Sequence, residues 1–342
     1  MHSKTSFATI PADVTRRKRG DLEFLADLSP RDKPADEHKA WSEKMAAALL
    51  PAGLSKQAAR VRDCAEAVFF HMHADNKNGE IGLKLHSAPY CHYRHCPTCQ
   101  WRRSLKAKAT VMSALPGILQ KYPAARFVML TLTIRNCPVS DLRETVGAMN
   151  AGWKRLILRK DWPALGWLRA VEVTRGKDGS AHPHYHCLLM LPPEYFSRNY
   201  LPTKAWVQLW REAMRLDYDP VCDVRIVRVK PGREMPDGTD ARLLAVSSAV
   251  SEVVKYATKA SDLLQGGPEW LREYVEQVRN LKFATSGGVL KGILTDVRPK
   301  NEDLVHVGGE EEVDGAVLDK LAFHWRTKHQ AYARKRGGGG AA

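Results

Sequence analysis

Three alternating histidines, in the segment His182-Pro183-His184-Tyr185-His186, most restrict how this chain can fold. An apolar run at residues 187–191 follows them at once, and this pattern predicts a β-strand that enters a hydrophobic core. Alternate side chains of a strand share one face and lie about 6.6 Å apart, at roughly 3.3 Å per residue. Histidines at that spacing can hold one divalent metal ion. Alternatively, one histidine packs or caps a turn and the others are solvated, but three on one face favour the metal site.

The composition indicates an acidic partner. The 342 residues are enough for one large domain or two moderate ones, and the formal net charge of +15 favours DNA or RNA as the partner. No apolar run is long enough to span a bilayer, and the N-terminus has no secretion signal. The seven cysteines include a metal-like cluster of four, which favours a reducing compartment, the cytoplasm, over a disulfide framework.

The cysteine cluster begins with the segment Cys91-His92-Tyr93-Arg94-His95-Cys96-Pro97-Thr98-Cys99. Cys96 and Cys99 have the two-residue spacing whose thiolates converge on one tetrahedral Zn²⁺ ion. Cys64 and Cys91 would complete four sulfur ligands, although His92 or His95 can replace one of them. A group of buried thiols without a metal is the alternative. Four protein ligands leave no open coordination position, so the predicted zinc site is structural.

The chain divides into four predicted regions. Residues 1–55 are expected to be flexible or peripheral, although residues 42–70 have a helical pattern. Residues 56–121 hold the zinc-binding segment and a basic helix from residue 101, residues 122–298 form the main α+β domain, and residues 299–342 are a C-terminal extension with a flexible tail. Arg102, Arg103 and Lys106 of the basic helix are predicted to contact DNA.

Within the main domain the periodicity predicts alternating strands and helices. Turn residues at 176–180 join the strand before them and the histidine strand into a hairpin. The resulting order β-α-β-β-α-β is the split βαβ unit of ferredoxin-like antiparallel sheets, whose first and third strands are central and adjacent. Thr131 and Thr133 should therefore lie beside the histidine strand. Strands are predicted at 127–134, 168–174, 182–191 and 224–229, and helices at 139–160, 203–216 and 242–264.

One side of the predicted helix 242–264 carries Glu252, Tyr256 and Lys259, within about 60° of one another and opposite an apolar stripe. A tyrosine hydroxyl, with an unperturbed pKa of about 10, is a poor nucleophile until a cation assists it. A metal ion on His184 and His186 can polarise a scissile phosphate. Lys259 can pair with the phosphate or favour the phenolate, and Glu252 can activate a water. An exposed tyrosine beside an ion pair is the alternative.

A metal ion on two histidines needs further oxygen ligands. Glu172, in the strand that pairs with the histidine strand, is the best candidate for one. The loop length leaves open whether Glu172 shares the histidine face. Lys255, next to the tyrosine, is predicted to contact DNA.

These motifs resemble, in order, those of plasmid rolling-circle replication initiators, in the HUH endonuclease superfamily. Residues 127–133 (FVMLTLT) with Asn136 look like the first motif, and residues 182–188 (HPHYHCL) look like the HUH motif. Residues 252–259 resemble the tyrosine motif of the single-tyrosine class, which has a nearby catalytic glutamate. Residues 96–103 (CPTCQWRR) are similar to the cysteine-rich stretch before the catalytic domain, and the match runs from about residue 60 to residue 295.

The resemblance implies a site-specific DNA nickase and ligase. It would cut one strand at a double-strand origin through a 5′-phosphotyrosine at Tyr256, leave a 3′-hydroxyl primer for the host DNA polymerase, and end by cleavage and rejoining. A host helicase is a further expected partner. The implied cofactor is Mg²⁺ or Mn²⁺ on His184 and His186, with His182 in a supporting role. The glutamate expected to direct termination by water maps to Glu252.

Two other functions remain open from the sequence. A transposase of a rolling-circle insertion element would use the same HUH chemistry, often with two tyrosines, and Tyr274 is a candidate for the second. A zinc-dependent DNA-binding regulator without catalysis would explain the charge and the cysteines, but not the alternating histidines.

Overall fold

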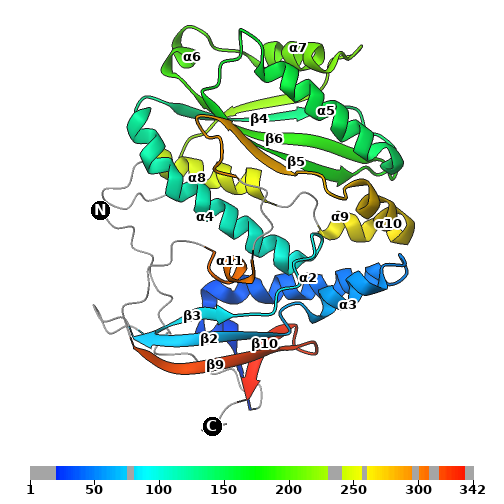
Figure 1. The fold of residues 1–342 in the computed structure, drawn as a ribbon, viewed down its shortest axis with the longest axis vertical. Helices are drawn as coiled ribbons and strands as arrows, with labels where there is room; N and C mark the ends of the chain where they lie inside the picture. Colours follow the sequence, from blue (N-terminus) through cyan, green and yellow to red (C-terminus); the bar gives the residue numbers. More distant parts are fainter. Residues whose placement is uncertain are drawn as a thin grey trace. The chain divides into compact units, whose positions relative to one another are not determined.

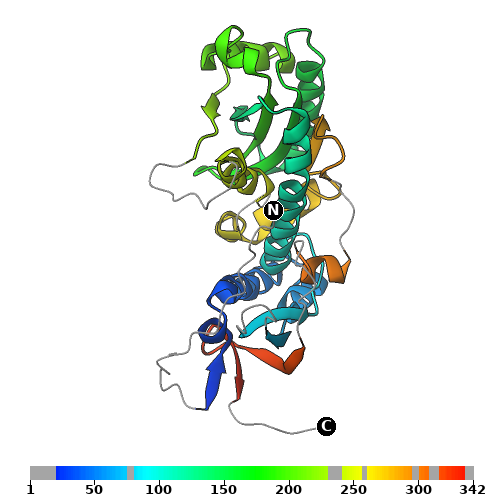
Figure 2. The ribbon, with the colours of Figure 1, turned by 90° about the vertical axis from the view of Figure 1, so that its left-hand side faces the viewer.

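The computed structural model of the chain describes residues 21–74, 81–229, 241–255, 260–294, 300–307 and 316–335. The chain forms two compact units, residues 1–106 with 299–342 and residues 107–298, whose helices and strands are drawn in Figures 1 and 2. The predicted flexible tail at residues 337–342 lies outside the described residues. Across the described ranges, no helix has both the length and the apolar character needed to cross a membrane.

The first unit is built on a five-stranded antiparallel sheet, in the order β1-β10-β9-β2-β3. Burial alternates along β9, with Leu321 and Phe323 buried and Lys320 and His324 exposed, so at this strand one face of the sheet lies in a core. The strands are β1 (Leu22–Phe24), β2 (Ala67–Ala74), β3 (Ile81–Ser87), β9 (Val317–Arg326) and β10 (Ala331–Lys335).

Helices cover the buried face of this sheet. The Trp325 indole of β9 donates a hydrogen bond to Glu43 of α2, at 2.7 Å, and Met45 and Leu49 on the same helix are buried. The helices are α1 (Leu25–Leu28), α2 (Lys33–Leu49), α3 (Ser55–Asp63), α11 (Asn301–Val305) and the start of α4 (Pro97–Lys121), with a 3-10 turn at Pro30–Asp32.

The first unit differs from the sequence-based expectation in three places. Residues 33–49, which fall in the region expected to be flexible or peripheral, form a helix with a buried stripe. The helical pattern at 42–70 corresponds to parts of two helices, and residue 67 already begins a strand. The extension 299–342 supplies two strands of the sheet. The helix at residues 33–49 was not expected because α2 is rich in charged residues and buries only a narrow stripe, so its sequence resembles a solvated segment.

The second unit contains a second antiparallel sheet, in the order β7-β4-β6-β5-β8. The first and third predicted strands are adjacent, and the α+β class with an antiparallel sheet is confirmed. β8 was not predicted. The strands are β4 (Arg126–Thr133), β5 (Gly166–Arg175), β6 (Ala181–Leu191), β7 (Cys222–Ile226) and β8 (Ala284–Gly288).

Each face of this sheet is covered by helices, which gives the second unit three layers (Figure 1). On one face, Tyr185 of β6 contacts the rings of Trp153 on α5 and Trp210 on α7. On the other, Leu188 of β6 packs with residues of α8 such as Val250. The helices are α5 (Leu142–Ile157), α6 (Pro193–Ser197), α7 (Thr203–Met214), α8 (Ala241–Val254), α9 (Ala260–Gln265), α10 (Gly267–Gln277) and the later turns of α4, with a 3-10 turn at Val139–Asp141.

Candidate functional site

The central strand β6 gathers the candidate metal ligands on one face of the second sheet. His184 pairs with Glu172 of β5 on one side and with Thr133 of β4 on the other. His186 pairs with Thr131 of β4 in the same way. Directly paired residues of adjacent strands share a face. Glu172 therefore lies on the histidine face, which the sequence left open.

Three side chains converge at this point. The Nε2 atom of His186 lies 2.8 Å from Oε2 of Glu172, and Nε2 of His184 lies 3.7 Å from the same oxygen. The three ligand atoms all lie within 4.8 Å of one another. Adjacent ligands of an octahedral ion at 2.0–2.1 Å are separated by about 3 Å. The donor set and its spacing therefore fit one divalent ion, and three protein ligands leave positions open for water or phosphate oxygen.

The backbone orients one of these rings. Nδ1 of His184 lies 3.2 Å from the carbonyl oxygen of His182. A carbonyl oxygen can only accept, so Nδ1 carries a proton, and in the neutral ring the lone pair of Nε2 is left for a metal ion. This is how proteins usually fix the tautomer of a metal-binding histidine.

His182 is held beside the cluster by a polar network. Its Nδ1 lies 2.7 Å from Oδ1 of Asn136, whose Nδ2 donates to Ser180 Oγ at 2.7 Å. The rings of His182 and His184 are stacked, with centroids 5.2 Å apart. Burial, and then the charge of His184, lower the pKa of His182. The side chain of His182 therefore packs against the ring of His184 and lies outside the group of three convergent side chains.

The carboxylate of the cluster is charged in spite of its burial. Glu172 is 6% exposed and His184 is 8% exposed. Burial alone would raise the pKa of Glu172, but the hydrogen bonds and charges of His184 and His186 outweigh it and hold that pKa well below its usual range. A buried anion with two imidazoles is an arrangement suited to a cation.

Helix α8 packs on the same sheet face as this cluster. Val250 and Val253 lie in one buried cluster with Leu188 of β6 and Ala170 of β5. Ala170 pairs with His186, so the helix approaches the strand positions next to the ligands. In the sequence, Tyr256 comes two residues after Val254, the last residue of this helix.

The polar side of α8 carries Glu252, whose carboxylate forms an ion pair with Lys255 at 2.6 Å. Both side chains are partly exposed, at 44% and 35%. The predicted nucleophile Tyr256 and its partner Lys259 lie outside the described residues. Tyr274, the candidate for a second nucleophile, is fully buried and stacks on Trp270.

The four predicted zinc ligands come together in the first unit. The Sγ atom of Cys99 lies 3.5 Å from that of Cys64 and 3.7 Å from that of Cys91. With Cys96, all four sulfurs lie within 4.8 Å of one another. A tetrahedral Zn²⁺ ion with bonds of about 2.3 Å separates its sulfur ligands by about 3.8 Å. The cluster fits such an ion, and neither His92 nor His95 belongs to it.

Comparison with known proteins identifies the family. A family model described as "Replication protein" matches residues 82–333, well over half of the chain. This chain belongs to the replication protein family. The matched region contains the histidine strand, α8 and three of the four clustered cysteines. Membership in this family confirms the resemblance to plasmid replication initiators.

Relatives of this replication protein cover most of its length. "Protein rep" of Lactiplantibacillus plantarum is 33% identical over 297 residues, which are 81% of this chain and 88% of the relative. "Protein rep" of Bacillus amyloliquefaciens is 32% identical over 297 residues, or 82% and 85%. A "Replication protein" of Staphylococcus aureus is 30% identical over 226 residues, or 62% and 92%. No solved structure matches.

Arg102, which was predicted to contact DNA, is buried within the first unit of this replication protein. It is 6% exposed and donates hydrogen bonds to the carbonyl oxygens of Leu304, at 2.6 Å, and Val305, at 2.7 Å. These carbonyls end α11, so the guanidinium satisfies backbone groups that have no partner within the helix. The guanidinium of Arg102 is therefore engaged within the first unit, whereas the prediction of a DNA contact expected an exposed side chain.

The neighbouring cations are less enclosed. Arg103 donates to the carbonyl oxygen of His92 at 2.7 Å, and Lys106 lies 3.7 Å from a carboxylate oxygen of Asp303. Both side chains are partly exposed, so they keep N–H groups that can meet phosphate.

Two residues that support the cysteine cluster were missed. Lys39 of α2 is fully buried and donates to the carbonyl oxygen of Cys64 at 2.8 Å. The hydroxyl of Ser42 lies 3.7 Å from Sγ of Cys96. Both residues lie in a segment whose sequence resembles a solvated helix. The one sequence feature that relates them is their three-residue spacing, which places them on one helix face.

Proposed function

We propose that this chain initiates rolling-circle replication as an HUH endonuclease, nicking one DNA strand at a double-strand origin. The convergence of Glu172, His184 and His186 carries the proposal, because these three side chains could hold one divalent ion on the sheet face against which α8 packs. The residue order leads from this helix directly to Tyr256, and α9, which follows it, contacts β5. Family membership supports the replication role.

Glu172, His184 and His186 would hold a Mg²⁺ or Mn²⁺ ion, which supplies positive charge to the scissile phosphate and to its transition state. Imidazole ligands favour Mn²⁺ over Mg²⁺ in this pair. The buried carboxylate keeps its charge, and the His182 carbonyl keeps the Nε2 lone pair of His184 directed at the site.

Tyr256 is the proposed nucleophile. Its hydroxyl oxygen forms a bond to phosphorus while the bond from phosphorus to the 3′ oxygen breaks. The phenolic proton passes to solvent base, and the 3′ oxygen takes a proton and leaves as a hydroxyl. Lys259 would pair with the phosphate or favour the phenolate. The 5′-phosphotyrosine keeps the energy of the ester, so a later hydroxyl can reseal the strand.

Other residues would serve the start and the end of the cycle. The 3′ hydroxyl would prime host DNA polymerase, with a host helicase opening the duplex. Glu252 would activate water at the end, when the protein is released by hydrolysis. Lys255, Arg103 and Lys106 would contact phosphates, and the four cysteines would hold structural Zn²⁺.

A transposase with two tyrosine nucleophiles is the weaker alternative. Tyr274 is fully buried against Trp270, and a nucleophile needs access to its phosphate. A DNA-binding regulator without catalysis would not explain why Glu172 and the two histidines converge.

The experiment is to incubate the full-length protein with single-stranded DNA from its own origin and Mn²⁺, and to separate covalent adducts under denaturing conditions. Wild type should form an adduct whose DNA is attached through its 5′ end, and Tyr256→Phe should form none. Tyr200→Phe, which alters an exposed tyrosine of the same unit, is the control and should match wild type. An unchanged adduct in Tyr256→Phe would remove this residue from the mechanism.

A further inference from the structure

The face of the first sheet that is turned away from α2 carries an unusual central residue. Phe69 of β2 is 39% exposed, although its neighbours in sequence, Val68 and Phe70, are buried. It pairs with Ala322 of β9, a small side chain that leaves one side of the ring open. We name the exposed outward face of β2, β3 and β9 the platform, because the outward residues of β10 are buried against β1.

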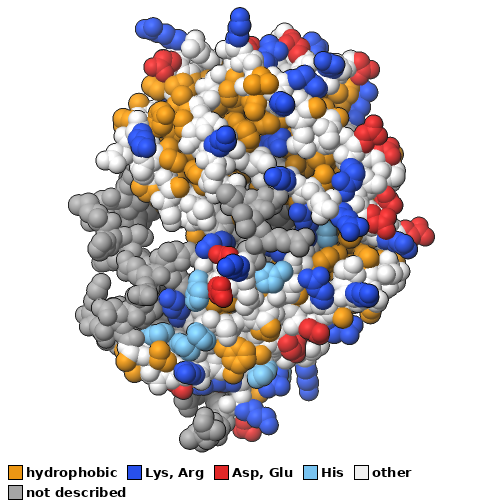
Figure 3. Space-filling view, in the orientation of Figure 1, with side chains coloured by type: hydrophobic (Ala, Val, Ile, Leu, Met, Phe, Trp, Pro, Cys, Tyr) orange, Lys and Arg blue, Asp and Glu red, His pale blue; other side chains and the backbone are white. Residues whose placement is uncertain are grey.

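Imidazole rings surround Phe69 on the platform. His71 follows it on the same face of β2 and stacks on His86 of β3, with centroids 3.9 Å apart and ring planes inclined by 14°. His324 of β9 is exposed and sits diagonally across from Phe69, about 7 Å away by the geometry of paired strands. Figure 3 shows histidines with lysine and arginine around an apolar patch where β2 and β9 lie. The platform thus presents flat rings in its middle.

Cations lie beside these rings on the platform. Lys84 pairs with His71 on one side and Lys320 pairs with it on the other, and Arg326 lies farther along β9. Among the described strand residues whose side chains share this face, none is acidic. The charged side chains of the platform are therefore all positive, which suits an anionic polymer.

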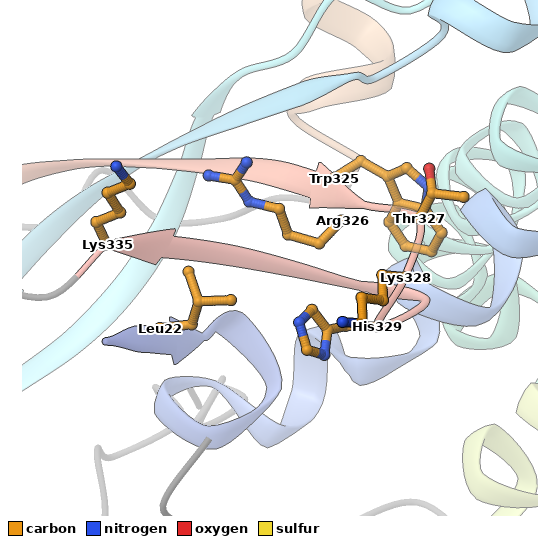
Figure 4. Close-up of a pocket in the computed structure, with 7 residues that line it drawn as sticks. All are labelled: Leu22, Trp325, Arg326, Thr327, Lys328, His329 and Lys335. Carbon is orange, nitrogen blue, oxygen red and sulfur yellow. The ribbon is translucent and has the colours of Figure 1, made fainter. Parts of the chain in front are cut away.

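At one edge the platform has a basic pocket of about 390 Å³. Arg326, Lys328, His329 and Lys335 line it, from β9, the hairpin turn and β10 (Figure 4). The Nε atom of Arg326 is buried and has no hydrogen-bond partner within the described part of the chain. A buried donor without a partner costs free energy that an anion would recover.

We propose that the platform binds single-stranded DNA, with bases stacked on Phe69 and on the His71–His86 pair and a phosphate in the basic pocket. Aromatic rings on an open sheet with a cationic rim are how proteins hold single strands, because unpaired bases expose their faces. In duplex DNA the bases are stacked on one another, so they cannot stack on an exposed phenylalanine. This inference rests on the proposed function, because nicking at an origin would release the single strand that the platform binds.

The test measures anisotropy of fluorescein-labelled dT12, which has no nick site, with full-length zinc-loaded protein and no added Mn²⁺. Phe69→Ala should weaken binding by about 5- to 100-fold, the effect of losing one base stack. Phe69→Tyr, which keeps a ring, should bind within about twofold of wild type. Tyr200→Ala, which removes an exposed ring of the second unit, is the matched control and should bind like wild type.

A second variant tests the pocket independently of any folding defect. Lys328→Gln with Lys335→Gln alters two exposed residues of the pocket and should reduce the slope of log affinity against log salt by about 0.7, the value for one phosphate contact. An unchanged slope, unchanged binding in Phe69→Ala, or equal competition by a 12-base-pair duplex would each overturn the proposal.

These outcomes separate the two proposals. Wild type that forms the covalent adduct but binds dT12 independently of Phe69 would refute the platform alone. Wild type that binds dT12 through Phe69 but forms no adduct would refute the nicking function alone.

Discussion

The carbonyl oxygen of His182 lies 3.2 Å from Nδ1 of His184, so the first histidine of the motif orients the second through its backbone. The contact places the proton on Nδ1 and leaves Nε2 free, 3.7 Å from the Glu172 carboxylate. The alternation of histidines therefore does more than supply ligands. Its strand geometry also selects the tautomer that binds metal.

Replacing Glu172 with glutamine should weaken Mn²⁺ binding by at least about 10-fold, because the carboxylate is the only anionic ligand of the group. Isothermal titration calorimetry with Mn²⁺ measures this directly, without DNA. Asp223→Asn is the control, since Asp223 is a carboxylate on the same sheet face that lies opposite Thr131 and outside the cluster. Equal affinities in wild type and Glu172→Gln would exclude Glu172 as a ligand.

The cysteine cluster should bind one zinc ion per chain, released by a thiol-modifying reagent and detected with a metallochromic dye. Cys96→Ser should lose this ion and several kcal/mol of stability in the first unit, because structural zinc contributes folding free energy. Cys137→Ser should keep both, since Cys137 lies in the second unit and outside the cluster. A folded wild-type protein without zinc would refute the site.

Strands with local signals were predicted well from the sequence. β4 and β6 alternate or run apolar, and the turn at 176–180 joins β5 to β6. The register of that hairpin was not predictable, because a slip of one residue would move Glu172 to the other face. For the same reason the sequence indicated Glu172 as a possible metal ligand but did not predict that it shares a face with the two histidines.

The sheet of the first unit could not be predicted, because its partners lie at opposite ends of the chain. Leu22 pairs with Lys335, and no local pattern reports such a partner. β8 was missed because Gly287 and Gly288 are typical of turns. A Cβ atom at Gly287 would clash with the Trp167 ring, so glycine there permits the close approach of β5.

Glu252→Ala should nick at the wild-type rate but release the covalent adduct more slowly by hydrolysis, because the variant lacks the carboxylate proposed to activate water. A time course of adduct decay after nicking measures both steps. Glu276→Ala, another exposed glutamate in an ion pair on a helix of the same unit, is the control. Equal decay in Glu252→Ala and wild type would remove this role, and impaired nicking would show that Glu252 acts earlier.

Asp36→Asn should stabilise the protein at pH 8. Burial raises the pKa of the Asp36 carboxyl from 3.8 to about 6, against the opposing hydrogen bond that it accepts from the Tyr332 N–H. The folded state therefore binds the proton more tightly than the unfolded state. Stability from the protonated form is fully present below about pH 4 and is lost as the pH rises through about 6.

Asparagine keeps the acceptor for Tyr332 and never ionises, so Asp36→Asn should exceed wild type by about 1–2 kcal/mol at pH 8, after allowance for partial exposure of the carboxyl. Below pH 4 the two proteins should be equally stable. Urea unfolding of the zinc-loaded proteins measures the free energy of unfolding at both pH values. Because the variant is compared with wild type at the same pH, the contributions of other titrating groups, such as His38, cancel. Glu302→Gln, at an exposed glutamate on α11 of the same unit, should show no such gain. A difference that did not change between the two pH values would mean that ionisation of Asp36 is not its cause.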